Sequence, residues 1–185
     1  MEEDLKDERT FERLDRSQIG TWLERLDKKL TPERGLRRLG QIELEAIESA
    51  PASGRILLLI HGTFSDSETL VTNFKGNPRG ADFLDWARGH YSHILTFDHP
   101  TLSVSPILNA RTLALLLGTT GAEIDVVCHS RGSLVARWWL EVFDRAPPEK
   151  WRVVFVGSHL GGTGLAAPTS LRGSRAGMQC GQCSR

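Results

Sequence analysis

Residues 123–137 read Glu-Ile-Asp-Val-Val-Cys-His-Ser-Arg-Gly-Ser-Leu-Val-Ala-Arg, and this stretch decides the fold. Its first half is rich in β-branched residues and predicts a buried strand that stops at Ser130. After Gly132, apolar residues recur at helical offsets as far as Phe143, which predicts a helix. A strand, a tight turn with serine at its apex and a helix are the layout of a nucleophile elbow. The motif reads C-H-S-R-G over residues 128–132, where the usual spelling is G-x-S-x-G.

Other apolar runs predict the remaining strands of a sheet. Strands are expected at 55–60, 92–97 and 152–156, and an alternating edge strand at 41–46; helices are expected at 82–88 and 105–117. Strands that alternate with helices predict an α/β fold with a mostly parallel sheet flanked by helices. Polar and glycine-rich segments follow four of the strands. In parallel sheets the ligand site lies outside the carboxyl ends of the strands, so these segments should converge there.

The N-terminal 40 residues differ from the remainder of the chain. The first 49 residues hold 23 of the 46 charged side chains. Apolar residues fall on one helical stripe between Ile19 and Leu30, which predicts a charged helical arm over residues 1–40. Thr31 and Pro32 end that helix and favour a short second one. The arm either packs on the domain or binds a partner.

The predicted α/β core covers residues 41–168, and residues 169–185 predict a disordered tail without periodicity. The pair Cys180 and Cys183 has C-x-x-C spacing, but no second pair or nearby histidine completes a zinc site, so no metal is expected. The three cysteines do not form a disulfide framework, and a cytoplasmic setting is therefore the expectation.

The composition is that of one ordinary globular domain. Of the 185 residues, 39% are hydrophobic and 25% charged, and the formal net charge is zero. A neutral balance does not favour nucleic acid or an anionic membrane surface as a partner. No apolar run approaches the length of about 18 residues that a membrane-spanning helix requires. We expect no transmembrane segment and no nucleic-acid partner.

The motifs resemble those of the α/β-hydrolase superfamily. The segments 60–65 (I-H-G-T-F-S), 98–101 (D-H-P-T), 129–132 (H-S-R-G) and the glycine-rich run 157–163 occur in the order found in lipase- and esterase-like members. More closely, the chain is similar to bacterial lipase-like proteins with H-G-T-F-S and H-S-R-G-G motifs. The resemblance covers roughly residues 42–168. It implies an α/β-hydrolase-like fold and hydrolysis of a carboxylic ester or lipid-like substrate, without a cofactor.

The resemblance also implies roles for individual residues. Ser130 corresponds to the nucleophile that forms an acyl-enzyme, and the backbone N–H groups of Thr63 and Arg131 correspond to the oxyanion hole. The residues expected to line the pocket or support its loops are His61, Gly62, Phe64, Asp98, His129 and Gly132.

The triad partners of Ser130 are not evident in this sequence. In the superfamily an acid and then a histidine follow the serine along the chain. Here the acids after Ser130 are Glu141, Asp144 and Glu149, and the only later histidine is His159, which is the candidate base. The sheet also stops about two strands short of the family pattern. We therefore expect a truncation or frameshift near residue 168.

Two functions follow as alternatives. The chain is either a serine hydrolase or a catalytically incompetent α/β-hydrolase module that acts as an interaction domain. Missing strands would expose a sheet edge, and an exposed edge predicts self-association. A small-molecule ester or lipid-like compound is the expected substrate.

Overall fold

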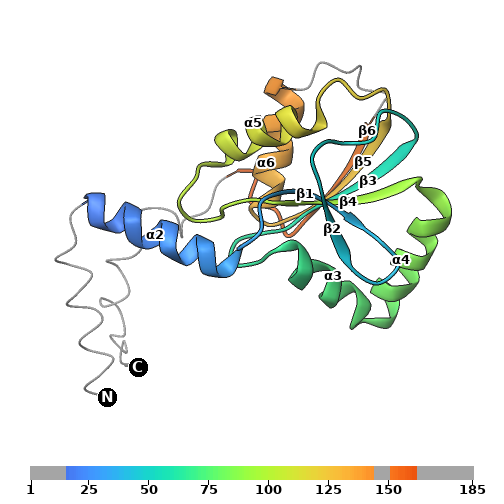
Figure 1. Cartoon of the computed structure of the whole chain (residues 1–185), viewed down its shortest axis with the longest axis horizontal. Coiled ribbons are helices and arrows are strands. Elements are labelled where there is room, and N and C mark those ends of the chain that lie inside the picture. Colours follow the sequence, from blue (N-terminus) through green and yellow to red (C-terminus); the bar gives the residue numbers. More distant parts are fainter. Residues whose placement is uncertain (1–15, 144–150, 162–185) are drawn as a thin grey trace, which may run out of the picture.

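The computed structural model describes residues 16–143 and 151–161, and its six strands form one sheet in the order β2-β1-β4-β3-β5-β6 (Figure 1). Strand β1 runs antiparallel to both of its neighbours, and the pairs β4–β3, β3–β5 and β5–β6 are parallel. The predicted α/β class is confirmed. The strands are β1 (Gly35–Leu39), β2 (Leu44–Ile47), β3 (Arg55–Ile60), β4 (His93–Asp98), β5 (Glu123–His129) and β6 (Trp151–Val156).

Helices cover both faces of this sheet, as Figure 1 shows. Helices α3 and α4 pack together on one face, and α5 and α6 pack together on the other. Helix α6 continues into a short π-helical turn, η1. Helix α2 lies to one side of the domain. The helices are α2 (Arg16–Leu30), α3 (Ser67–Lys75), α4 (Pro78–His90), α5 (Pro106–Leu117), α6 (Gly132–Trp138) and η1 (Trp139–Phe143).

Two apolar clusters, one on each face, explain the composition of the central strands. Ile56, Leu58 and Ile60 of β3 join the cluster beneath α5 and α6, whereas Leu57 and Leu59 join the cluster beneath α3 and α4. All five side chains are buried because alternate residues of a strand point to opposite faces. Strand β3 therefore needs an apolar residue at every one of these positions. The loop that begins at His61 follows this strand directly.

One predicted element is wrong. Residues after Pro32 were expected to form a short helix, and they form strand β1 instead, so the sheet begins before residue 41. Leu36 and Leu39 of this strand are buried, and β1 pairs with both β2 and β4. Burial of apolar side chains and the hydrogen bonds of two ladders outweigh the weak local preference for helix.

Helix α4 is longer than the sequence pattern predicted. It begins at Pro78, directly after Asn77, whose side chain accepts hydrogen bonds from the N–H groups of Arg79 and Gly80. An asparagine cap followed by proline is a strong helix start. Helix α3, which no prediction covered, is capped in the same way by Asp66.

The edge of the sheet at β6 is open within the described residues, where β6 pairs only with β5. Val154, Phe155 and Val156 have exposed fractions of 56, 41 and 46%. The expected self-association at this edge stays a prediction. The expected tail at 169–185 lies outside the described residues, as do Asp144 and Glu149.

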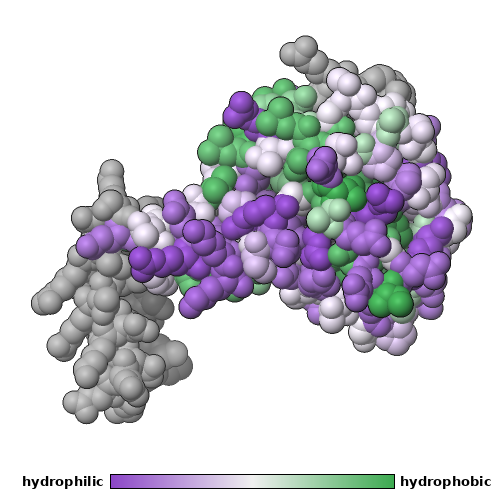
Figure 2. Space-filling model, viewed as in Figure 1, coloured by the Kyte–Doolittle hydropathy of each residue, from purple (hydrophilic) through white to green (hydrophobic). Residues whose placement is uncertain are grey.

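The surface divides into hydrophilic and hydrophobic areas. Figure 2 shows that α2 is mainly hydrophilic on the side in view, whereas hydrophobic residues gather over α5. Exposed apolar side chains of α5 include Leu108 and Leu115. Within the described residues, no helix is both long and apolar enough to span a membrane.

Candidate functional site

Ser130 occupies a sharp turn between β5 and α6. Its φ angle is 50°, in the left-handed region that non-glycine residues rarely adopt. Holding a side chain there costs roughly 1–3 kcal/mol, which the surrounding structure must offset. The Ser130 N–H donates to the carbonyl of Val156 (2.9 Å), so the turn is tied to the end of β6. This backbone geometry is that of the strand–turn–helix that lifts a serine hydroxyl out of a sheet.

Two glycines allow this turn and the loop after β3 to touch. A Cβ on Gly132 would lie 2.5 and 2.7 Å from the carbonyl oxygens of His61 and Ile60. A Cβ on Gly62 would lie 2.9 Å from the Cβ of Ser130. Cβ atoms do not approach other heavy atoms within 3.0 Å, so neither position has room for a side chain. The backbone of the His61 loop therefore lies directly against the serine.

The N–H groups of Thr63 and Arg131 are free within the described structure. Neither donates a hydrogen bond to a described residue. Strands β3 and β5 are neighbours and pair in parallel, with Ile60 opposite Cys128, so the loops that carry the two groups leave the same edge of the sheet. Unpaired N–H groups beside a serine hydroxyl can stabilise negative charge on an oxygen atom.

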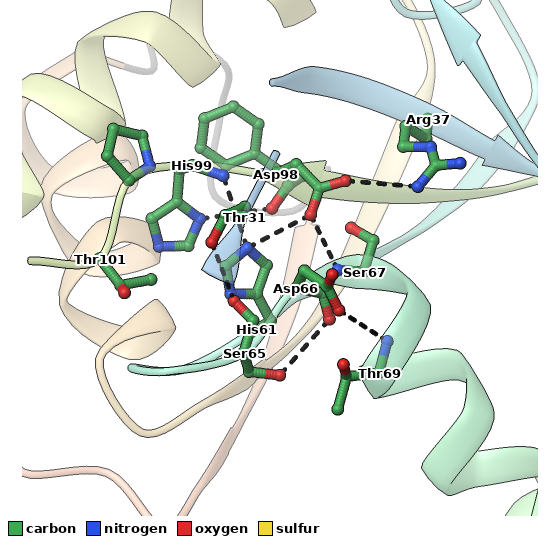
Figure 3. A network of polar contacts seen from close by, with 12 residues as sticks. Thr31, Arg37, His61, Ser65, Asp66, Ser67, Thr69, Asp98, His99 and Thr101 are labelled. Atoms are coloured by element: carbon green, nitrogen blue, oxygen red, sulfur yellow. Dashed lines mark hydrogen bonds and ion pairs between the residues drawn. The ribbon is translucent and has the colours of Figure 1, made fainter. Parts of the chain in front are cut away.

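A buried polar network around His61, Asp98 and His99 supports the loop after β3 (Figure 3). The Nδ1 atom of His61 lies 3.0 Å from the carbonyl of Gly62, and its Nε2 accepts a hydrogen bond from the N–H of His99 (3.4 Å). The neutral form of His61 therefore carries its proton on Nδ1. Its ring stacks on that of His99 with centroids 4.3 Å apart.

Asp98 joins this network from the end of β4. Its Oδ1 accepts the N–H of Ser67 (2.8 Å) and lies 3.5 Å from Nε2 of His61, while its Oδ2 lies 3.7 Å from Nη1 of Arg37. Burial raises the pKa of Asp98, and the contacts with Ser67, His61 and Arg37 only partly oppose that effect. Asp98, His61 and His99 are all fully buried, so they support the loop rather than face a substrate.

The stability of the protein should fall as the pH drops from 7.5 to 5.5. Burial lowers the pKa of His61 and lowers that of His99 further. In the unfolded chain both rings bind protons near pH 6.5, whereas in the folded chain they stay neutral to lower pH. The free energy of unfolding therefore decreases by up to about 1.4 kcal/mol per pH unit for each histidine.

Urea unfolding at a series of pH values tests this expectation. The raised pKa of Asp98 acts in the opposite direction, because the folded carboxyl then binds its proton above the ordinary value of about 3.9 and stability rises as the pH falls toward it. His99→Gln removes one of the two titrating rings and should flatten the slope. A free energy of unfolding that stays constant or rises between pH 7.5 and 5.5 would contradict the assignment of two neutral, buried histidines.

The candidate base lies near the elbow without touching the serine. His159 follows β6 and is exposed. His129, the residue before the serine, is also exposed, and its ring lies 3.7 Å from where a Cβ of Gly157 would stand. Within the described residues, no histidine or carboxylate forms a hydrogen bond with Oγ of Ser130. Ser130 thus lies against the loop that contains Gly62 and Thr63, and no described histidine or carboxylate bonds to its hydroxyl.

Two other elbow residues have structural contacts. The Arg131 guanidinium donates through Nη2 to the carbonyl of Val104, and burial lowers its pKa. Cys128, at the position of the missing motif glycine, is buried, and burial raises the pKa of its thiol to about 11. A thiol with that pKa is protonated at neutral pH, which makes Cys128 a weak nucleophile.

Phe64 differs from the other loop residues. Its φ angle is 57° and 67% of its surface is exposed, although the residue is large and apolar. Its N–H donates to the hydroxyl of Thr101 (3.4 Å). The backbone of the loop is therefore held in a strained conformation, and its apolar ring is presented to solvent.

Sequence reasoning missed the residue that ties helix α2 to this site. Asp27 is 1% exposed, and its carboxylate accepts hydrogen bonds from residues 101–103. The sequence does hint that Asp27 is buried, because it lies four residues after Leu23 and three before Leu30, on the same side of the helix as the apolar stripe. Its partners lie more than 70 residues away in the chain, and no local pattern identifies them.

The fold and the site define an α/β protein with a serine at a strained strand–helix turn. The chain belongs to the family described as a domain of unknown function (DUF7379), whose model matches residues 31–173. No curated protein and no solved structure matches the chain. The family match includes the whole sheet and the elbow, and Asp27 precedes it. In the part of the chain that the structure describes, no three potential metal ligands cluster.

Proposed function

We propose that this chain is a serine hydrolase-like protein of the α/β-hydrolase superfamily that cleaves a carboxylic ester or lipid-like substrate. One observation carries the proposal: Ser130 has a φ angle of 50° at the end of β5, against the loop that carries Thr63. A plain turn would be free to use glycine or asparagine at this angle. Keeping serine in a strained conformation beside unpaired N–H groups fits a nucleophile.

The proposed reaction begins with attack of Ser130 Oγ on the ester carbonyl. A bond forms between Oγ and the carbonyl carbon, and the bond to the alcohol oxygen breaks. The Oγ proton passes to a base and then to the departing alcohol. The N–H groups of Thr63 and Arg131 stabilise the negative charge on the carbonyl oxygen. Water then hydrolyses the acyl-enzyme, which releases the acid and restores the serine.

His159 is the proposed base. It follows the strand next to β5, and the hydrogen bond from the Ser130 N–H to Val156 joins the elbow to the end of that strand. His61 and His99 are unsuitable because both are buried and contact other protein groups. The exposed ring of Phe64, two residues after the Gly62 that lies against Ser130, supports a substrate with an apolar acyl group, since it would cover such a group from water.

A non-catalytic interaction module is the second candidate. The observation in its favour is that no described histidine or carboxylate contacts Ser130 Oγ. An unassisted serine hydroxyl is a weak nucleophile at neutral pH. The two candidates make opposite predictions for ester turnover by the whole chain.

Hydrolysis of a p-nitrophenyl acyl ester separates the candidates. The hydrolase proposal predicts a burst of nitrophenol with one equivalent per chain, because the acyl-enzyme accumulates. His159→Ala should lower kcat about 100- to 10,000-fold, which is the usual contribution of a general base. His90→Ala is the matched control, because His90 is an exposed histidine at the end of α4 and should leave kcat unchanged.

Each alternative outcome has a distinct meaning. Absence of turnover in folded wild-type protein would favour the non-catalytic module. If the wild type turns over the ester and His159→Ala does so equally fast, the chain is a hydrolase but His159 is not its base.

A further inference from the structure

Helix α2 reaches the carboxyl edge of the sheet through one buried carboxylate. Asp27 Oδ1 accepts the N–H groups of Thr101 (2.8 Å) and Leu102 (3.0 Å), and Oδ2 accepts the N–H (2.7 Å) and hydroxyl (2.6 Å) of Ser103. Hydrogen bonds to an ionised acceptor are roughly twice as strong as neutral ones. The surrounding apolar residues of α2 are only partly buried, and Asp27 is the one fully buried residue among those of the helix whose burial the structure describes.

The anchored loop leads directly to the elbow. Val104 is the next residue along the loop, and its carbonyl accepts a hydrogen bond from Nη2 of Arg131. Arg131 follows Ser130, and its N–H is one of the two proposed oxyanion donors. A displacement of residues 101–104 would therefore pull on the side chain of Arg131, and through it on the backbone N–H of the same residue.

The same end of α2 also holds the loop after β3. The hydroxyl of Thr101, which lies 3.4 Å from Asp27 Oδ1, accepts the N–H of Phe64. One turn further along, the hydroxyl of Thr31 donates to the carbonyl of Ser65 (3.2 Å). Both contacts fix the segment beside Thr63, which carries the other proposed donor. The end of α2 is thus linked to both segments: Thr31 bonds directly to Ser65, and Asp27 reaches Arg131 through residues 101–104.

We propose that Asp27 is a positioning residue, which holds the two oxyanion donors at a fixed separation through residues 101–104. The proposal rests on the proposed function. It assigns a role in the site to a helix that precedes the region matched by the family model. Because preorganised donors act on the charge that develops in the transition state, their displacement should slow the reaction step and leave substrate binding unchanged.

Labelling of Ser130 by a fluorophosphonate tests this role when combined with amide hydrogen exchange. Asp27→Asn keeps the size of the side chain, but it removes the charge and turns an NH2 group toward N–H donors. The expected result is a 10- to 100-fold lower maximal labelling rate with an unchanged half-saturating concentration. This decrease is smaller than the roughly 100- to 1,000-fold decrease that removal of one donor causes, because Asp27→Asn displaces the donors without removing them. Exchange should accelerate in residues 62–65 and 130–134.

Two further variants test the same link between α2 and the elbow if Asp27→Asn folds poorly. Thr31→Val conserves shape and removes only the bond to Ser65, so exchange should accelerate at 62–65 and not at 130–134. Glu24→Gln changes an exposed carboxylate on the same helix and should alter neither measurement.

The outcomes separate this proposal from the proposed function. A wild-type labelling rate and wild-type exchange in folded Asp27→Asn would overturn the positioning role while the hydrolase stands. If wild-type protein is not labelled at Ser130, the proposed function fails, and exchange alone decides whether Asp27 holds both loops. Faster exchange in both segments then upholds the coupling, and unchanged exchange overturns it.

Discussion

Replacing Ser130 with alanine is expected to lower kcat/KM for ester hydrolysis by at least about 1,000-fold. The hydroxyl is the only group at the elbow apex that can form an acyl-enzyme. Without it the two N–H groups can still polarise a bound carbonyl, but no covalent intermediate forms. Steady-state rates with p-nitrophenyl esters, together with the disappearance of the burst, measure the effect.

Ser130→Gly serves as the control for folding. Glycine adopts a φ angle of 50° without the steric cost that a Cβ atom carries, so this variant should be at least as stable as the wild type. It should be as inactive as Ser130→Ala. Substantial activity in both variants would show that Ser130 is a turn residue and not a nucleophile.

Replacing Gly132 with alanine is expected to destabilise the fold by about 3 kcal/mol, at the upper end of the effects of overpacking. The new Cβ would lie 2.5 Å from the carbonyl oxygen of His61 and 2.7 Å from that of Ile60. Both oxygens belong to the backbone at the end of the central strand β3, so they cannot rotate away as a side chain would. The strand and the elbow would have to separate.

Urea unfolding of Gly132→Ala beside Gly89→Ala measures this effect. Gly89 lies within α4, and a Cβ there would meet no atom within 4 Å, so alanine should stabilise the protein by about 0.5–1 kcal/mol. Equal stability of Gly132→Ala and the wild type would contradict the close contact between the elbow and the His61 loop.

Much of the sheet could be predicted from the sequence because its central strands are buried on both faces. Strands β3, β4, β5 and β6 lie within one or two residues of the expected ranges, and α5 begins at Pro106 as its serine–proline start indicated. The turn at Ser130 was also expected. Continuous apolar runs and glycine positions can be read from neighbouring residues alone, and the elements that they predict are present in the structure.

The remainder depends on contacts that are distant in sequence. Strand β1 forms because Leu36 and Leu39 join the two faces of the sheet, which no pattern near Pro32 reveals. The role of Asp27 depends on backbone N–H groups of a loop 74 residues away. The roles of His61 and Asp98 as supports of one loop likewise require the pairing of β3 with β4.

The site at which a fluorophosphonate modifies the folded wild-type protein shows directly whether Ser130 is the nucleophile. We expect one covalent adduct per chain, which mass spectrometry locates on the peptide that contains Ser130 and which Ser130→Ala abolishes. Ser158→Ala, at the serine beside the end of β6, should retain the adduct. An unmodified folded protein, or an adduct on another residue, would show that Ser130 is not the nucleophile.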